Sequence, residues 1–366
     1  MADPGPDRWL SVESALGAAA AVYGGAMALR AECYRRGLLA SRHLSCPVVS
    51  VGNLTIGGTG KTPMVVYLAR RLLVAGKKPA VVSRGYRGAL ETTGGIVSDA
   101  SRVLLPAEAA GDEPWLIANL LKGVPVVVGK DRCRAARIAQ RAFSPDVILM
   151  DDGFQHLRMR RSLDLLLLDA TCPFGNGRIF PRGVLREPIS AAARADAVVL
   201  TRSGEPDEPL PPGLENIRAI DRKPIFRAVH RPRLRGVASP GAAFLPEAAT
   251  TAAEPLAAKR VFAFSGIARN ESFQQSIRAL GGRLAGAKGF SDHHRYPGPE
   301  RAALERAARR AGADLMATTE KDFARLGGQN PFGMPLAVAG VEISMVSGQE
   351  GLDSLLDACT DRHRRD

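Results

Sequence analysis

Short apolar runs alternate with helical patterns over residues 47–200 of the chain. The runs predict strands at 47–51, 80–83, 125–128, 147–150, 163–168 and 197–200. Helical patterns lie between them, at 64–75, 113–121 and 132–142. Several runs are apolar at every position, which is typical of strands covered on both faces. The alternation predicts an α/β fold, with a mostly parallel sheet and helices on both of its faces.

A second α/β pattern follows a change of composition near Gly204. Residues 205–212 are rich in proline and acidic residues and predict a linker. A strand is predicted at 225–229, and a segment rich in proline and alanine then runs to about residue 258. Beyond it, the pattern predicts strands at 261–266, 315–318 and 336–341 and a helix at 300–311. We therefore expect a smaller C-terminal α/β domain.

The first predicted strand leads into a glycine-rich loop that ends in Gly-Lys-Thr and opens a helix. Backbone N–H groups of such a loop can point inward and hold phosphates. Its lysine is expected to reach the β- and γ-phosphates, and its threonine hydroxyl to bind Mg²⁺. Thr55 stands where the strict pattern has glycine, but the next two glycines keep the backbone permissive. The loop predicts a P-loop NTPase-like fold with nucleotide contacts from Thr55, Ile56, Gly57, Gly58, Thr59, Gly60, Lys61 and Thr62.

Two acidic residues, Asp151 and Asp152, follow the predicted strand at 147–150. An aspartate at the carboxyl end of such a strand can hold Mg²⁺ directly or through water. The alternative is an aspartate that caps the turn before Gly153. The guanine-reading sequence Asn-Lys-x-Asp does not occur in the chain, so ATP is the expected nucleotide and Mg²⁺ the expected cofactor.

The N-terminal region carries an uncharged segment from Ser14 to Leu29, and arginines follow it. The segment is shorter than the roughly 20 residues that a membrane span needs. It predicts either an amphipathic helix in the plane of a membrane surface or a helix packed on the domain. The first residues lack a basic region, so no cleavable signal peptide is expected. The expected parts are a membrane-proximal helix at 1–45, a P-loop domain at 46–224 and a C-terminal domain with its linker at 225–366.

Composition narrows the classes of partner. The formal net charge is +13, which favours an acidic partner such as a membrane or a phosphorylated substrate, although a general richness in arginine also contributes. Aromatic residues make up only 5% of the chain, which argues against a platform for single-stranded nucleic acid. The five cysteines are scattered and form no CxxC pair, so neither a disulfide framework nor a zinc site is indicated. A reducing cytoplasm fits this cysteine pattern.

Several motifs occur in the order of a known family. They are the P-loop, Gly-Asp-Glu-Pro at 111–114, Asp-Asp-Gly-Phe-Gln-His at 151–156, Leu-Arg-Glu-Pro at 185–188, Ser-Asp-His-His at 291–294 and Thr-Glu-Lys-Asp at 319–322. Together they resemble the tetraacyldisaccharide 4′-kinase family of lipid A biosynthesis, over about residues 10–345. The P-loop is shared with many families, whereas the rest of the set is much more specific. The threonine at 55 belongs to the family pattern.

The resemblance implies an ATP- and Mg²⁺-dependent transfer of the γ-phosphate to the 4′-hydroxyl of a tetraacylated glucosamine disaccharide 1-phosphate. The product is a lipid IVA type of lipid A precursor. The enzyme is expected to be peripheral to the cytoplasmic face of the bacterial inner membrane, with its N-terminal helix meeting the lipid. No protein partner is implied, and no nucleic acid.

Basic residues beyond the ends of predicted strands are candidates for holding substrate phosphates. Three arginines lie in the loop at 175–187, and ligands of open parallel sheets bind beyond the carboxyl ends of strands. The alternative for these arginines is a solvated basic loop. Glu187 is a further candidate for the metal, and its alternative is an ion pair with Arg186. The substrate or phosphate candidates are Arg132, Gln155, His156, Arg178, Arg182 and Arg186.

A sugar hydroxyl is a poor nucleophile, so a base is expected within hydrogen-bond reach of it. Asp112 is the candidate base, with Lys61 as the further catalytic residue. The alternative role of Asp112 is to cap the helix that follows, and Glu113 is better placed for that role. The resemblance pairs Asp112 with His293, and makes His294 the lesser of the two adjacent histidines.

The main alternative from another class is a membrane- or partner-switching ATPase of the ParA/MinD type. Such proteins use a similar loop but place a lysine where this chain has Ile56. A switching ATPase would hydrolyse ATP on dimerisation without any lipid acceptor, which distinguishes it from a kinase.

Overall fold

The structure is a computed structural model that describes residues 12–214, 217–243 and 256–362. The chain divides into two compact units that interleave in sequence. Unit 1 comprises Met1–Lys61, Asp152–Val229 and Met345–Asp366, and unit 2 comprises Thr62–Asp151 and His230–Ser344. The domain boundaries expected at residues 45 and 224 stay a prediction, and the start of the chain considered for a signal peptide lies outside the described residues.

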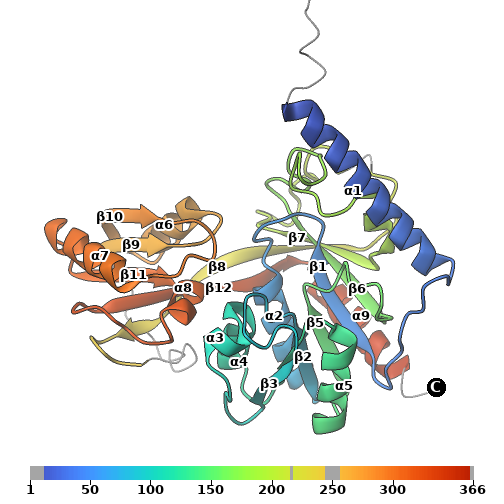
Figure 1. Ribbon diagram of the computed structural model, residues 1–366, viewed down its shortest axis with the longest axis horizontal. Helices are drawn as coiled ribbons and strands as arrows, with labels where there is room; N and C mark the ends of the chain where they lie inside the picture. Colours follow the sequence, from blue (N-terminus) through green and yellow to red (C-terminus); the bar gives the residue numbers. More distant parts are fainter. Residues whose placement is uncertain (1–11, 215–216, 244–255, 363–366) are drawn as a thin grey trace, which may run out of the picture. The chain divides into compact units, whose positions relative to one another are not determined.

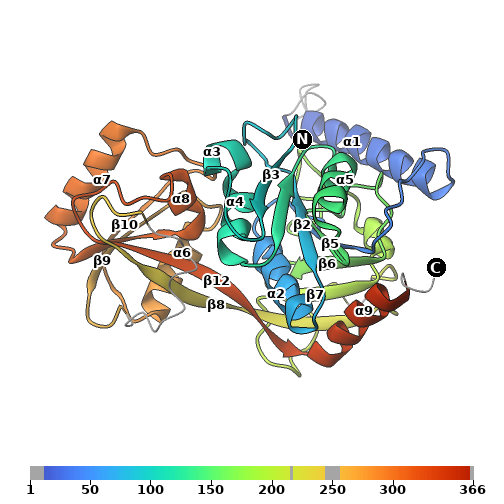
Figure 2. The ribbon, with the colours of Figure 1, turned by 90° about the horizontal axis from the view of Figure 1, so that it is seen from below.

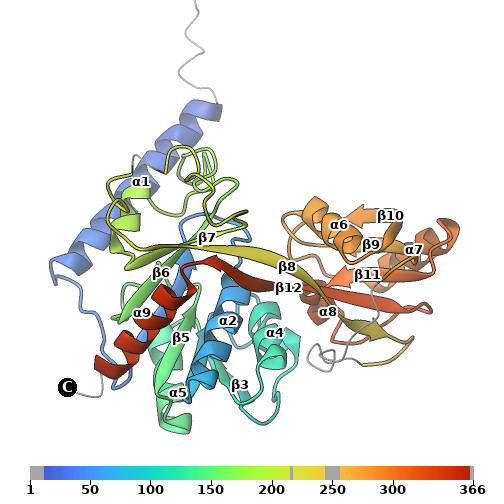
Figure 3. The same ribbon diagram turned by 180° about the vertical axis from the view of Figure 1, so that it is seen from behind.

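Unit 1 is built on parallel strands in the order β8-β7-β6-β1. The strands are β1 (Val48–Asn53), β6 (Leu163–Asp169), β7 (Ala197–Thr201) and the first residues of β8 (Ile225–Ala238). Every residue of β1, β6 and β7 is buried, as expected for strands that are apolar on both faces. The unit also contains α1 (Val12–Arg35), the 3-10 helix η2 (Ile189–Arg194) and α9 (Gln349–Arg362), which packs along β6 (Figure 3).

Helix α1 is longer than the uncharged segment that predicted it. It has 24 residues, and only Ala20 and Gly24 are buried. Figure 1 shows it beside the loops that follow β6, where Tyr23 meets the ring of Phe180 edge-on at 6.2 Å. Among the described residues, α1 is the one helix long and apolar enough to cross a membrane. That finding supports a span only weakly, because signal sequences and core helices share the same length and composition.

Unit 2 contains a first group of strands in the order β5-β2-β4-β3. These are β2 (Pro79–Ser83), β3 (Gly95–Asp99), β4 (Pro125–Val128) and β5 (Val147–Asp151), of which only β3 runs antiparallel. The accompanying helices are α2 (Lys61–Val74), α3 (Ala107–Ala110), α4 (Asp112–Leu120) and α5 (Arg132–Phe143). Figure 2 shows α5 against this group, where Asp131 caps the helix by accepting from the N–H groups of Cys133 and Arg134.

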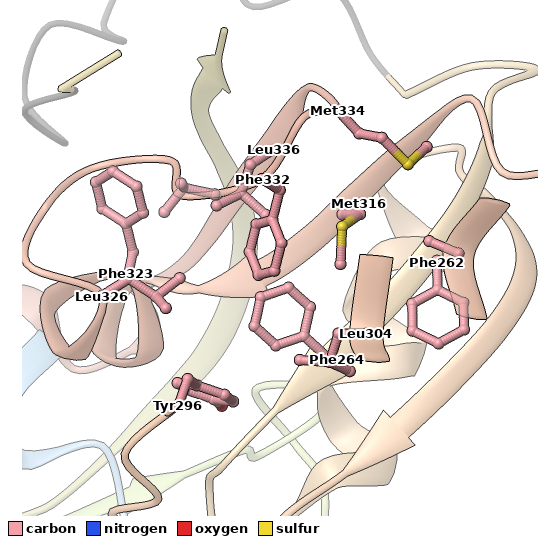
Figure 4. Close-up of a cluster of buried hydrophobic side chains, with 12 residues drawn as sticks. Phe262, Phe264, Tyr296, Leu304, Met316, Phe323, Leu326, Phe332, Met334 and Leu336 are labelled. Atoms are coloured by element: carbon pink, nitrogen blue, oxygen red, sulfur yellow. The ribbon is translucent and has the colours of Figure 1, made fainter. Parts of the chain in front are cut away.

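A second group in unit 2 has the order β10-β9-β11-β12-β8, with parallel pairing from β10 to β12. It comprises β9 (Arg260–Ser265), β10 (Arg283–Gly289), β11 (Leu315–Thr319) and β12 (Leu336–Ser347), with α6 (Asn270–Ala279), α7 (Gly298–Arg310) and α8 (Glu320–Arg325). Its core gathers aromatic rings from several elements. Phe264 packs edge-on against Tyr296 at 5.4 Å and Phe332 at 5.5 Å (Figure 4).

The predicted mostly parallel α/β fold is confirmed, and the helix expected near the N-terminus is present as the apolar helix α1. Each strand expected between residues 47 and 200 is present within one or two residues of its predicted bounds. The pattern did not predict β3, β10, α6 or α9, and it predicted only the first third of β8. The strand β10 is the clearest case, because its sequence Arg-Leu-Ala-Gly-Ala-Lys-Gly offers few apolar positions and most of it is partly or fully exposed.

Candidate active site

The glycine-rich loop of unit 1 is held in place by a second segment of the same unit. The Ile56 N–H donates to the Val184 carbonyl at 2.7 Å, and the Arg186 N–H donates to the Leu54 carbonyl at 2.7 Å. Gly60 has a φ of 89°, a conformation that favours glycine. These two hydrogen bonds tie the start of the loop to the segment at 184–186.

The loop lysine stands between an amide and a carboxylate. Lys61 Nζ lies 3.3 Å from Asn53 Oδ1 and 3.6 Å from Asp152 Oδ1. Arg186 Nη1 donates to both carboxylate oxygens of Asp152 at 2.9 Å. Asp152 therefore brings together the charge of the P-loop lysine and that of an arginine expected to hold phosphate.

Asp152 follows β5 on a turn that lies close to β1. Gly153 N–H donates to the Val51 carbonyl at 3.1 Å. A Cβ atom on Gly52 would lie only 2.6 Å from the Phe154 Cβ, so a glycine is required where the two segments approach. Gln155 Nε2 donates to the Asn53 carbonyl at 2.8 Å, which ties the Asp-Asp-Gly-Phe-Gln-His motif to the end of β1.

Glu187 does not pair with Arg186. Its Oε2 accepts from Arg194 Nη2 at 2.5 Å, and the Arg194 guanidinium lies over the Phe154 ring at 4.6 Å. Glu187 is 2% exposed, and its Oε1 makes no hydrogen bond among the described residues. A buried carboxylate oxygen without a donor is a suitable ligand for a cation.

The remaining metal candidates lie in unit 2 and are buried. Asp151, at the end of β5, accepts from Ser83 Oγ at 3.1 Å through its Oδ2. Thr62, in the first turn of α2, is 5% exposed. Carboxylate and hydroxyl oxygens are the ligands that Mg²⁺ prefers, so the residue types fit the expected ion.

Asp112 and His293 lie together in unit 2 although 181 residues separate them in sequence. Asp112 Oδ2 lies 3.3 Å from His293 Nδ1. The same oxygen accepts from Arg325 Nε at 2.6 Å, and Arg325 Nη2 lies 3.4 Å from His293 Nδ1. Asp112 is the first residue of α4, and the N-cap position belongs to Gly111. The capping alternative for Asp112 is therefore wrong.

Arg325 is itself held by a second carboxylate. It is 4% exposed as a side chain, and its Nη1 donates to Asp322 Oδ1 at 2.8 Å and to the Gly266 carbonyl at 2.6 Å. Tyr296 also donates to Asp322 Oδ1, at 2.8 Å. Burial raises the pKa of the Tyr296 hydroxyl, and the neighbouring Asp322 charge raises it further, so the hydroxyl stays a donor.

Opposing influences set the charge of Asp112. Burial raises the pKa of this carboxyl, but the hydrogen bond with His293 and the charge and hydrogen bond of Arg325 outweigh it. The resulting pKa is below its ordinary range, and Asp112 is ionised at neutral pH. An ionised carboxylate 3.3 Å from the imidazole can orient the ring and stabilise a proton on it.

The two adjacent histidines have different surroundings. His293 has a positive φ of 60°, and Tyr86 meets its ring edge-on at 5.4 Å. His294 Nε2 instead lies 2.5 Å from Glu300 Oε2, and its ring stacks on Phe290 at 4.5 Å. The geometry thus distinguishes a histidine joined to Asp112 from one that contacts Phe290 and Glu300 of α7.

The other phosphate candidates are dispersed. In unit 1, Arg178 and Arg182 are exposed on the loop near α1, and His156 is half-buried. In unit 2, Arg132 is buried at the start of α5 and donates to the Lys130 carbonyl at 3.2 Å. Arg186 contacts a metal candidate, Asp152.

Sequence reasoning missed Asn53, Arg194, Arg202 and Arg325, which contact the loop or the candidate residues directly. One signal was available for Arg325, which lies three residues after the Thr-Glu-Lys-Asp motif and one helical turn from Asp322. Arg202 contacts Gly58, which is 144 residues away in sequence. Arg194 and Asn53 lie only seven and eight residues from Glu187 and Lys61, but no motif marks them.

The loop, its lysine and the strand-end aspartates define a P-loop nucleotide-binding protein. The chain matches the model of the family described as tetraacyldisaccharide-1-P 4′-kinase over residues 12–361. It therefore belongs to that family, and it is a kinase rather than a switching ATPase.

Relatives support the assignment over most of the chain. A tetraacyldisaccharide 4′-kinase of Desulfatibacillum aliphaticivorans is 40% identical over 96% of this chain and 94% of its own length. One from Geobacter sulfurreducens is 46% identical over 84% of this chain and 82% of its own. A crystal structure described as the "apo" form of LpxK from Aquifex aeolicus in complex with ATP matches with a TM-score of 0.73 and 29% identity, over 96% of this chain and all of that one.

Proposed function

We propose that this chain transfers the γ-phosphate of ATP to the 4′-hydroxyl of a tetraacylated glucosamine disaccharide 1-phosphate. The observation that carries the proposal is the family match over residues 12–361, in a chain whose P-loop lysine lies beside the strand-end aspartate. The ATP described for the Aquifex aeolicus structure supports the choice of nucleotide.

The P-loop is proposed to bind the phosphates of ATP through its backbone N–H groups and Lys61. Lys61 Nζ is already near anionic oxygen at Asp152, 3.6 Å away, and a phosphate would provide the same kind of partner. Its charge would offset the negative charge that develops on the transferred group. Arg186, bound to Asp152, would be drawn to phosphate in the same way.

Mg²⁺ is proposed to bind through Thr62 and through Asp151 or Asp152, with Glu187 as a further ligand. Bound Mg²⁺ would neutralise phosphate charge and orient the transferred group. The buried Oε1 of Glu187, which has no hydrogen bond among the described residues, supports its place in this set.

Asp112 and His293 are proposed to remove the proton of the acceptor hydroxyl. The bond from the 4′ oxygen to the γ-phosphorus would form as the bond to the β,γ-bridging oxygen breaks, and the hydroxyl proton would pass to the Asp112–His293 pair. Their 3.3 Å contact supports a joint role. Because the hydrogen bond with His293 and the charge and hydrogen bond of Arg325 lower the pKa of Asp112, the carboxylate alone is a weak base, and a role shared with the imidazole becomes more favourable.

The enzyme is proposed to work at the cytoplasmic face of the inner membrane. Val22 and Leu29 of α1 are 74% and 65% exposed, so these apolar side chains are available to meet lipid. Arg178 and Arg182, on the loop beside α1, are proposed to meet anionic groups of the substrate.

Transfer of label from γ-labelled ATP to the purified disaccharide-1-phosphate lipid tests the proposed function. We expect a labelled lipid with wild-type protein and none with Lys61→Ala. Label released only as inorganic phosphate, at the same rate with and without lipid, would contradict the kinase assignment.

A further inference from the structure

Two successive carbonyl groups of the P-loop are held by two successive residues at the end of β7. Thr201 Oγ1 donates to the Thr59 carbonyl at 2.9 Å, and Arg202 Nη2 donates to the Gly58 carbonyl at 2.8 Å. All four residues belong to unit 1. Thr201 and Arg202 lie at the end of β7, which is two places away from β1 in the sheet. The two hydrogen bonds therefore depend on a segment outside the loop.

These two bonds also determine where two N–H groups point. The peptide unit is planar and trans, so its C=O and its N–H point in opposite directions. Holding the Gly58 carbonyl towards Arg202 directs the Thr59 N–H away from it, and holding the Thr59 carbonyl does the same for the Gly60 N–H. Gly60 has a positive φ of 89°, whereas Thr59 does not. Adjacent residues of this kind turn their N–H groups to one side as an anion-binding nest.

The other terminal nitrogen of the Arg202 guanidinium contacts a carboxylate. Arg202 Nη1 lies 2.5 Å from Asp169 Oδ2, and Thr171 holds the other oxygen of that carboxylate through its N–H at 3.1 Å and its Oγ1 at 2.7 Å. Arg202 also has a φ of 54°, which is uncommon for a residue with a side chain. Strained backbone of this kind persists where the surroundings impose it, and it gathers at functional sites.

We propose that Thr201 and Arg202 form a clamp that sets the P-loop in its phosphate-binding shape, with Arg202 as a positioning residue for the polyphosphate of ATP. Arg202 acts through the loop backbone rather than on the substrate. The inference rests on the proposed ATP binding and is independent of the lipid acceptor.

Equilibrium binding of ATP and of inorganic tripolyphosphate to the full chain tests the clamp. Arg202→Ala removes the charge-assisted hydrogen bond to the Gly58 carbonyl together with the contact to Asp169, and is expected to weaken binding of both ligands about tenfold. Arg202→Lys should fall in between, because a single ammonium cannot reach both Asp169 and the Gly58 carbonyl as the guanidinium fork does. Thr201→Val keeps the side-chain shape and should also weaken both ligands.

Kinetics separate positioning from a general structural role. The clamp acts on bound ground state and transition state alike, so Arg202→Ala should raise KM for ATP about tenfold and change kcat by less than about threefold. Arg222→Ala, at an exposed position of the same unit, is the matched control and should change neither constant.

Two results would overturn the clamp. The first is unchanged tripolyphosphate binding in both Arg202→Ala and Thr201→Val. The second is weaker ATP binding with unchanged tripolyphosphate binding, which would assign Arg202 to the nucleoside. If Arg202→Ala is unfolded at the assay temperature, binding of ATP and tripolyphosphate to Thr201→Val and Arg202→Lys tests the clamp by the same two criteria. Transfer to lipid that persists in any of these variants leaves the proposed kinase function intact.

Discussion

Arg325 Nε donates to Asp112 Oδ2 at 2.6 Å, on the same oxygen that faces His293 Nδ1. The pair therefore includes a third, permanently charged member that holds Asp112 ionised. Arg325 is buried and its partner Asp322 is fully buried, so the arrangement has little freedom to rotate. The consequence is an imidazole fixed beside a carboxylate whose charge does not depend on pH near neutrality.

The Asp112–His293 pair should behave as one unit. We expect Asp112→Asn and His293→Gln each to lower kcat by at least about 10²-fold, in the range of general-base catalysis, with ATP affinity nearly unchanged. The double variant should cost little more than the worse single one, because residues acting together are not additive. Single-turnover transfer rates at saturating ATP measure this, and strictly additive losses would remove the pair from the role of base.

Arg325→Lys should retain the charge but lose the fork that contacts Asp112, Asp322 and the Gly266 carbonyl. We expect kcat to fall while KM for ATP changes little, because the change displaces Asp112. Arg310→Lys, at an exposed position in α7 of the same unit, serves as the control. Equal losses in kcat for both variants would show that Arg325 has no special relation to the pair.

Acid stability should report the charge of Asp112. The pKa of Asp112 in the folded protein is below the ordinary value of about 3.9 that applies to the unfolded chain. The ionised carboxylate therefore stabilises the fold at pH values above about 3.9. This contribution is lost as pH falls through the lower folded value. Asp112→Asn should therefore flatten the dependence of the unfolding free energy on pH below about 4. Urea unfolding at pH values from about 3 to about 7 measures this dependence. If the free energy of unfolding depends on pH equally in wild type and Asp112→Asn, the assigned direction of the pKa shift is contradicted.

The metal candidates can be separated by single substitutions. Asp151→Asn and Asp152→Asn should raise the Mg²⁺ concentration needed for half-maximal activity, since each removes a charged oxygen ligand. Asp164→Asn, another buried aspartate, alters no proposed ligand and serves as a stability control. If Mg²⁺ titrations are superimposable for wild type and both variants, these carboxylates do not hold the ion.

Helix α1 should matter more for the lipid than for the nucleotide. Deleting residues 1–30 removes the exposed apolar side chains Val22 and Leu29, and should lower transfer to lipid in mixed micelles more than lipid-independent ATP hydrolysis. Both rates should be measured on the same preparation with its melting temperature. Proportional losses in the two activities would mean that α1 serves folding alone.

The sequence predicted the parts of this protein whose signal is local. The strand at 48–53 and the loop after it are read from adjacent residues, because a buried strand is apolar throughout and a phosphate loop needs glycine. The helix α9 was missed because it runs into the arginine-rich end of the chain and has few buried apolar positions, namely Leu352, Leu356 and Cys359. Arg202 and Arg325 were missed because their roles depend on a carbonyl and a carboxylate from distant segments. Asp112 and His293 were joined only by family resemblance, and no local pattern would have paired them.

The position of the new phosphate tests the account most directly. Wild-type protein, Mg²⁺, γ-labelled ATP and the disaccharide-1-phosphate lipid are incubated in mixed micelles, and the product is examined by ³¹P–¹H correlation spectroscopy. We expect one new phosphomonoester at the 4′ position, formed in proportion to ADP and absent with Lys61→Ala. ADP formed without a lipid phosphomonoester, or a phosphate at any other position, would contradict the proposed function.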